Sequence, residues 1–296
     1  MKLTITGYST ALFSSWYFIE ELGLLFDAGD GVAANLLQKS RKIKHIFVSH
    51  PDRDHITGLL QVRQLNAREG GYPFVYYPKD AGSFPAMDNF MSKFDPHTKE
   101  NIWTPLGQHQ DTFIKQGIFV RSIRNEHIEA PLDVIKSLSF DVIEVKRKRK
   151  ASFKDYSQEA LKAVRLEHGN DFITEEKQHS ILSYSGDTPV RDFDRWKDSK
   201  ILIHEATFLD ASVKHNKGRK KNEHSLLEEV IEMVAASKVE QLILGHFSSR
   251  YSKEQIKQAL TTLAQKHALN IPIFCIFPGE TMRDILAQPP THPSFQ

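Results

Sequence analysis

The sequence predicts an α/β protein with mixed β-sheets. Short apolar runs with the length of strands occur together with longer segments whose apolar residues recur at helical spacing. Each half of the chain opens with strand-like runs that lie close together in the sequence, as in hairpins. Each half then continues with strands that alternate with helices. This pattern indicates packed layers of sheet and helix rather than a helical bundle or an all-β fold.

The first half contains most of the strand candidates. Helices are predicted over residues 31–40 and 56–69, where apolar residues follow the helical period. The stretch 79–112 mixes Pro, Gly, Asp and Met and is predicted to form loops with short helices. The predicted strands of this half cover residues 3–8, 16–20, 24–27, 45–49, 74–77, 118–124 and 139–145.

A polar insertion at residues 146–179 separates the two halves, and it contains one predicted helix over residues 157–167. After it, strands are predicted at residues 181–185, 201–204, 241–244 and 273–277, and helices at 226–237 and 253–267. Two helix starts carry the pattern of a capping box, formed by Ser225 with Glu228 and by Ser252 with Gln255.

Length and composition predict one large domain. A chain of 296 residues suits a single α/β domain, or two fused halves that share a core. We assign the domain to residues 1–286 and expect the Pro-rich tail, 287–296, to be loosely attached. The net charge of +2 is too small to predict nucleic-acid binding by bulk attraction. Without a signal segment or a membrane-spanning run, the expected location is the cytoplasm, and the single Cys275 is expected to be a core thiol.

The most informative segment runs from Ser49 to His55. It follows an apolar strand candidate and places His50, Asp52, Asp54 and His55 within six residues, just before a helix. Imidazoles and carboxylates are the ligands that divalent metals take in proteins, and so dense a cluster repels itself without a cation. Taken alone, the segment also fits a polar turn in which an Asp caps the helix.

This segment resembles the His-x-His-x-Asp-His signature of the metallo-β-lactamase superfamily, with Asp52 in place of the second His. Within the superfamily the chain is most similar to ribonuclease Z, whose His-Glu-Ala-Thr motif matches residues 204–207 and whose catalytic His matches His224. The resemblance implies a four-layer αββα sandwich with two mixed sheets flanked by helices. The other matching positions, in the expected order, are residues 25–31, His127, residues 183–188 and residues 244–251.

The resemblance implies two divalent metal ions. Asp187 is expected to bridge them. Because Asp52 supplies a hard oxygen where the family has an imidazole, we expect manganese or iron to be preferred over zinc. The expected ligands are His50, Asp52 and His127 for the first ion and Asp54, His55 and His246 for the second.

The resemblance also implies phosphodiester hydrolysis by a metal-bound hydroxide, as in an endonuclease acting on RNA, including precursor tRNA. The predicted catalytic residues are Asp54, Glu205 and His224, with His224 as proton donor and Glu205 as its partner. Two other functions remain open: a phosphodiesterase for cyclic nucleotides or cyclic phosphates, and a non-catalytic nucleic-acid-binding relative. A homodimer is expected by resemblance only.

Two basic runs, at residues 146–150 and 214–221, could follow a phosphate backbone. Ribonuclease Z carries a Gly/Pro-rich arm that grips tRNA. In the corresponding region, 152–179, this chain has no Gly-Pro motif. Either a basic helical arm replaces the family's arm, or the substrate is not a tRNA.

Overall fold

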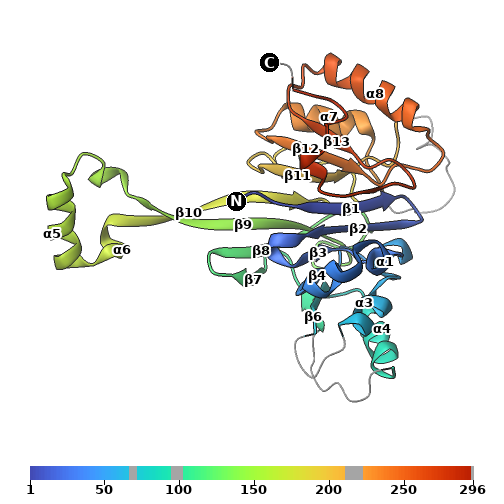
Figure 1. The fold of residues 1–296 in the computed structure, drawn as a ribbon, viewed down its shortest axis with the longest axis horizontal. Coiled ribbons are helices and arrows are strands. Elements are labelled where there is room, and N and C mark those ends of the chain that lie inside the picture. Colours follow the sequence, from blue (N-terminus) through green and yellow to red (C-terminus); the bar gives the residue numbers. More distant parts are fainter. Residues whose placement is uncertain (67–71, 95–102, 211–222, 295–296) are drawn as a thin grey trace.

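The chain folds into two seven-stranded β-sheets that pack face to face, with helices on both outer sides (Figure 1). The computed structural model describes residues 1–66, 72–94, 103–210 and 223–294. This arrangement confirms the predicted αββα sandwich. The first sheet contains β1 (Ile5–Thr10), β2 (Ser14–Ile19), β3 (Leu24–Phe26), β4 (His45–Phe47), β5 (Phe74–Pro78), β6 (Trp103–Leu106) and β14 (Thr281–Met282). The second contains β7 (Asp111–Lys115), β8 (Ile118–Arg124), β9 (Leu138–Arg149), β10 (Thr174–Tyr184), β11 (Ile201–Glu205), β12 (Gln241–Gly245) and β13 (Ile273–Cys275).

The two sheets repeat one topology. In each, neighbouring strands first pair antiparallel, from β1 to β3 and from β7 to β10. The following strands pair parallel, from β3 to β6 and from β10 to β13. The carboxyl ends of the parallel strands therefore lie at one edge of each sheet, where chemically active loops usually gather.

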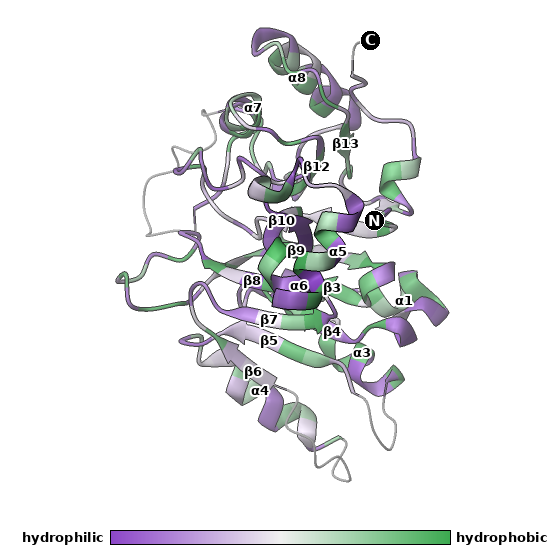
Figure 2. Cartoon of the chain, turned by 90° about the vertical axis from the view of Figure 1, so that its left-hand side faces the viewer, coloured by the Kyte–Doolittle hydropathy of each residue, from purple (hydrophilic) through white to green (hydrophobic). Residues whose placement is uncertain are grey.

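Three hydrophobic cores explain the continuous apolar runs in the sequence. Successive strand residues point to opposite faces, so Phe47 packs between the sheets while Ile46 packs under the helices of the first half. In the same way, Ile243 faces the other sheet and Leu242 faces the helices of the second half. Hydrophobic residues accordingly gather along central strands such as β3 and β4 (Figure 2). The helices are α1 (Val32–Leu36), α2 (Arg53–Ile56), α3 (Leu59–Leu65), α4 (Ser83–Ser92), α5 (Gln158–His168), α6 (Asn170–Ile173), α7 (Leu227–Ala235) and α8 (Lys253–Lys266).

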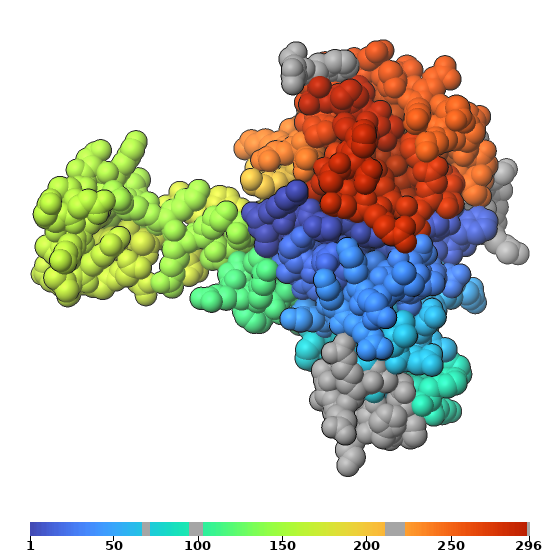
Figure 3. Space-filling view, in the orientation of Figure 1, coloured from blue at the N-terminus to red at the C-terminus, as the bar shows by residue number. Residues whose placement is uncertain are grey.

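The predicted polar insertion forms an arm that stands out from the body of the molecule (Figures 1 and 3). Strands β9 and β10 continue beyond the sheet as an antiparallel pair, and α5 and α6 lie at the end of this pair. The predicted helix at 157–167 corresponds to α5, which Ser157 caps by accepting a hydrogen bond from the Ala160 N–H. Both ends of the insertion are thus strand, which its polar sequence did not predict.

Two strands lie in the stretch that we expected to contain only loops and short helices. Strand β6 includes Pro105, which is depleted in strands, but β6 is the edge of its sheet and tolerates the missing N–H. Strand β7 is also an edge strand, and charged Asp111 and Lys115 at its ends hid its strand character in the sequence.

Several predicted helix boundaries are wrong. The helix predicted at 56–69 is divided at Gly58, whose N–H donates to the Ala28 carbonyl oxygen, so α2 and α3 are separate; residues 67–69 lie outside the described residues. The helix predicted at 31–40 ends at Leu36 and continues as a 3₁₀ turn. The capping box predicted for α7 does not form, because the residue that caps the helix is Leu226, whose side chain cannot accept a hydrogen bond; only Glu229 contributes, by accepting from the Leu226 N–H at 3.0 Å.

The tail is attached more firmly than the sequence predicted. His292 is buried and forms an isolated bridge with Ile273, and the Thr291 hydroxyl accepts a hydrogen bond from the Cys275 N–H at 3.0 Å. Cys275 itself is buried in the core, as expected. The expectation of a loosely attached segment is therefore wrong for the described part of the tail, because its backbone continues the edge of the second sheet.

Candidate metal centre

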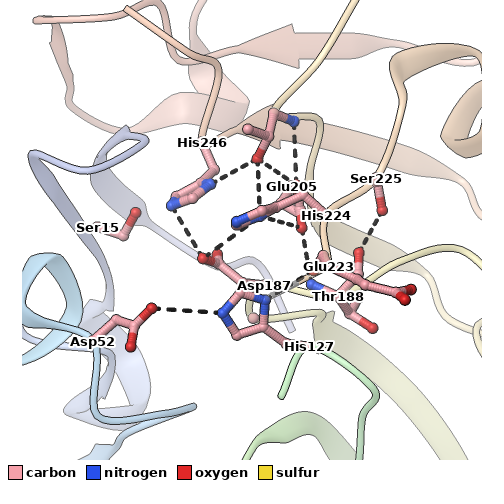
Figure 4. A network of polar contacts seen from close by, with 12 residues as sticks. Ser15, Asp52, His127, Asp187, Thr188, Glu205, Glu223, His224, Ser225 and His246 are labelled. Carbon is pink, nitrogen blue, oxygen red and sulfur yellow. Dashed lines mark hydrogen bonds and ion pairs between the residues drawn. The ribbon is translucent and has the colours of Figure 1, made fainter. Parts of the chain in front are cut away.

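The predicted ligands converge from both sheets at the carboxyl ends of their strands (Figure 4). His50 lies three residues after β4, His127 follows β8, Asp187 follows β10 and His246 follows β12. The centre therefore lies at the junction of the two halves, and neither half carries the whole ligand set. All seven predicted ligands are brought together here.

The first group consists of His50, His127 and Asp52. The Asp52 Oδ2 atom lies 3.6 Å from His50 Nε2 and 3.7 Å from His127 Nε2. The neighbouring imidazoles of His127 and His50 lower the pKa of the Asp52 carboxyl, so this side chain is an anion at neutral pH. One carboxylate oxygen and two imidazole nitrogens thus face a common point.

The second group consists of Asp54, His55 and His246. The Asp54 Oδ2 atom lies 3.6 Å from His55 Nε2 and 3.5 Å from His246 Nε2. These three ligand atoms lie close enough together to hold one ion. His246 has a φ of 58°, a conformation that residues other than glycine seldom adopt, and such strain is typical of functional positions.

Asp187 lies between the two groups. Its Oδ2 atom lies 3.7 Å from His50 Nε2, 3.3 Å from His55 Nε2 and 3.2 Å from His246 Nε2. It is the carboxylate that faces histidines of both groups, which is the position a bridging ligand needs. Gly186, with a φ of 58°, makes the turn that aims Asp187 inward, and a Cβ there would lie 2.8 Å from the Ser49 Cβ.

The hydrogen bonds of the four histidines test whether the residues fit a metal. The Nδ1 atom of His127 lies 2.8 Å from the Glu223 carbonyl oxygen, which can only accept, so Nδ1 carries the hydrogen. His55 Nδ1 likewise donates to the Asp27 carboxylate at 2.7 Å. In the neutral form of both rings the lone pair is therefore on Nε2, which points toward the centre.

In His50 and His246 the hydrogen is also on Nδ1, because each Nδ1 donates to a hydroxyl group. The Ser49 hydroxyl donates to Asp27, so it accepts from His50 Nδ1 at 2.9 Å. The Thr207 hydroxyl donates to the neighbouring Glu205 and accepts from His246 Nδ1 at 2.9 Å. The Nε2 atoms of all four histidines are buried and have no hydrogen-bond partner among the described residues. Buried, unpaired lone pairs that face carboxylates fit divalent ions.

Asp27 lies in the matching loop at residues 25–31 and supports the ligands, a role that was not predicted. This fully buried carboxylate accepts hydrogen bonds from the Ser49 N–H, the Ser49 hydroxyl, His55 and the Tyr184 hydroxyl. It therefore orients two histidine rings, one directly and one through Ser49. The sequence contained a sign of this role, because Asp27 follows an apolar strand, as the predicted ligands do. Thr207 was missed for a different reason: a hydroxyl is not a metal ligand here.

Glu205 and His224 lie beside the ligands. His224 Nδ1 is 3.0 Å from Glu205 Oε1 and 3.9 Å from Asp187 Oδ2. Glu205 is held in place by the Thr188 N–H at 2.9 Å and by Thr207. Burial lowers the pKa of His224, but the Glu205 carboxylate raises it more, and the resulting pKa is about 9.

Comparison with known proteins places this geometry in a family. A model described as the β-lactamase superfamily domain matches residues 23–247, which include strands of both sheets and every predicted ligand. The chain belongs to the β-lactamase superfamily. Within this superfamily it is 28% identical over 261 residues to ribonuclease Z of Staphylococcus aureus, an alignment that covers 81% of this chain and 83% of that protein.

Solved structures of the superfamily share the fold. The short form of human tRNase Z superposes with a TM-score of 0.55 at 18% identity and covers 84% of this chain and 93% of its own. A metallo-β-lactamase fold protein of Bacillus subtilis gives a TM-score of 0.60 at 13% identity, over 95% of this chain and all of that one. The expected resemblance to the metallo-β-lactamase superfamily and to ribonuclease Z is confirmed. Superfamily membership and the His/Asp groups together support a metal-dependent hydrolase.

Proposed function

We propose that this member of the β-lactamase superfamily is a two-metal phosphodiester hydrolase that cleaves RNA. The observation that carries the proposal is the pair of ligand groups that share Asp187, with a His–carboxylate pair beside them. Two divalent ions, when bound, activate water and stabilise the charge that develops on phosphoryl oxygens. The residues of the first and second groups would hold these ions, and Asp187 would contact both.

His224 supplies the proton that an RNA leaving group needs. A ribose oxygen leaves poorly as an alkoxide, so its departure requires a general acid. With a pKa of about 9, His224 carries a proton at neutral pH, and positive charge at the centre brings this pKa down toward the range of an efficient acid. Glu205 fixes the ring through Nδ1, which leaves Nε2 as the atom that donates.

The arm supports a polymeric substrate over a small one. The basic run from Lys146 to Lys150 follows the outer end of β9 and reaches the residues of α6 at the end of the arm. Arg147 forms ion pairs with Glu176 of β10 at 3.3 Å and with Asp171 of α6 at 2.7 Å, so part of this charge is neutralised within the arm. The second basic run, 214–221, lies outside the described residues.

Among the helices of the described chain, none has the length and apolarity to cross a bilayer. A homodimer and a cytoplasmic location stay predictions.

A panel of substrates tests the proposed function. The manganese- or zinc-loaded protein is incubated in parallel with precursor tRNA, generic single-stranded RNA, single-stranded DNA and bis-p-nitrophenyl phosphate. We expect hydrolysis of the aryl ester and of RNA, with a single 3′ product if precursor tRNA is the substrate. Cleavage of the aryl ester alone would favour a small-molecule phosphodiesterase. Binding of RNA without cleavage of any substrate would favour the non-catalytic alternative.

Metal preference is a separate prediction. Because the Asp52 oxygen replaces an imidazole, we expect higher activity with manganese or iron than with zinc, and Asp52→His should move the optimum toward zinc. Activity is titrated with each metal for both proteins. A matched control is Asp30→His, an exposed position in the loop after β3 that holds none of the proposed ligands. Highest activity with zinc in the native protein, unchanged by the substitution, would show that ligand hardness does not set the preference.

A further inference from the structure

The turn between β1 and β2 presents two neighbouring apolar side chains to solvent. Leu12 is 89% exposed and Phe13 is 61% exposed, and neither belongs to the three hydrophobic cores. Single exposed apolar residues are common, but two large ones at the tip of a hairpin expose a continuous apolar surface. Residues 3–19 around them contain no Asp, Glu, Lys, Arg or His. The hairpin that carries these two side chains is therefore itself uncharged.

Hydrogen bonds connect this turn to the two chain segments that carry the proposed ligands Asp54 and His246. The Leu12 N–H donates to Asp54 Oδ2 at 3.0 Å, and this oxygen also faces His55 and His246. The Ala11 N–H donates to the carbonyl oxygen of Phe247, the residue after His246, at 3.2 Å. The turn that carries the two apolar side chains is thus hydrogen-bonded through its backbone to Asp54, a proposed ligand.

The backbone of the turn is fixed in an unfavourable conformation. Leu12 has a φ of 70°, which a leucine seldom adopts, and the Phe13 N–H closes the turn on the Thr10 carbonyl oxygen at 3.0 Å. Asn or Gly would fit the same backbone with less strain. A strained, exposed leucine that donates to a ligand of the centre indicates a functional position rather than a packing position.

We propose that Leu12 and Phe13 form the contact surface for a nucleobase of the nucleotide whose phosphate lies at the metal centre. This inference rests on the proposed phosphodiester hydrolysis. The ligand groups would take the anionic part of the substrate, so the uncharged surface beside them suits the flat, largely apolar part that neighbours each phosphate. Stacking on a phenyl ring accepts any base, because every base has a π-face, and it favours nucleotides over simple phosphodiesters.

Two esters with the same leaving group test the proposal. Thymidine 5′-(p-nitrophenyl phosphate) and ethyl p-nitrophenyl phosphate both release p-nitrophenolate, but only the first carries a base. The variants are Phe13→Ser and Leu12→Asn, because Asn tolerates the positive φ and keeps the N–H that binds Asp54. We expect kcat/KM for the thymidine ester to fall about 5- to 50-fold and kcat/KM for the ethyl ester to stay within about twofold.

The matched control is Phe113→Ser. Phe113 is 70% exposed on edge strand β7 and pairs with Phe119 at the far end of β8 from His127. It should leave both esters unchanged. Equal losses on the two esters, or no loss on the thymidine ester, would overturn the proposal. A dimer of the native protein that sedimentation detects and that Phe13→Ser dissociates would also overturn the proposal. The surface formed by Leu12 and Phe13 would then bind a second copy of the chain.

A binding measurement separates this proposal from the proposed function. If the native protein hydrolyses neither ester, the proposed function fails. The binding data alone then test whether Leu12 and Phe13 contact a nucleobase. Saturation-transfer NMR compares thymidine 5′-phosphate with deoxyribose 5-phosphate on the manganese-free, zinc-loaded protein. We expect tighter binding of the nucleotide, and loss of this preference in Phe13→Ser. Equal binding of the two ligands by the native protein would overturn the proposal.

Discussion

Replacing Asp187 with alanine should remove at least one metal ion from the protein and abolish hydrolysis of every phosphodiester. Asp187 Oδ2 lies 3.2 to 3.7 Å from the Nε2 atoms of three histidines, so its loss leaves each ligand group without the carboxylate that they share. The loss of activity should exceed the roughly 10–100-fold that follows removal of a supporting residue around a metal ligand. Metal content per chain, measured by mass spectrometry after gel filtration, checks the binding part.

The control for this prediction is Asp141→Asn. Asp141 is a largely buried carboxylate on β9 that accepts hydrogen bonds from the Ser180 and Ser183 hydroxyls and faces none of the ligands. Burial raises the pKa of this carboxyl, so its neutral amide counterpart should be tolerated and should keep both ions. Circular dichroism confirms that each variant is folded. An Asp187→Ala protein that is folded and still holds two ions would exclude the shared ligand.

The second large effect is expected for His224→Ala, and it should depend on the leaving group. With RNA the rate should fall roughly 10²–10⁴-fold, because the ribose oxygen needs a proton as it leaves. With bis-p-nitrophenyl phosphate the loss should be far smaller, since a nitrophenolate leaves without help. Glu205→Gln should show the same dependence more weakly, because the hydrogen bond to His224 Nδ1 would remain without the charge.

His267→Ala is the control for His224. His267 lies at the end of α8, away from the ligands, and should leave both rates unchanged. Single-turnover rates on a labelled RNA and steady-state rates on the aryl ester are compared for all variants. Equal losses on both substrates would assign His224 to folding or to metal binding. No loss on RNA would remove it from the mechanism.

The convergence of the proposed ligands could be predicted from the sequence, because these residue types follow strand candidates in the order that the resemblance to the superfamily implies. Histidine and aspartate at the ends of apolar runs are visible without a structure, as His246 after β12 shows. The residues that orient them were harder to predict. Ser49 and Thr207 act through single hydroxyls, and only their distances to Asp27 and Glu205 reveal the direction of each hydrogen bond.

The arm escaped prediction for a different physical reason. Its strands have little hydrophobic periodicity, since Arg147 and Lys148 lie opposite acidic Glu176 and Glu175. The ion pair between Arg147 and Glu176 at 3.3 Å links the two strands, but each strand alone has the composition of a solvated loop. The edge strands β6 and β7 were missed because edge positions admit proline and charge.

Strand β10 joins the arm to the metal centre and so sets a distance between them. It begins at Thr174, next to α6, and its eleven residues end three positions before Asp187. At a rise of about 3.3 Å per residue, this strand spans about 36 Å. A molecule that touches both its ends must be at least that long, which is the length of about ten stacked base pairs. If the arm binds the substrate, a substrate shorter than this length cannot contact both the arm and the metal centre, and its cleavage rate should not change when the arm is removed.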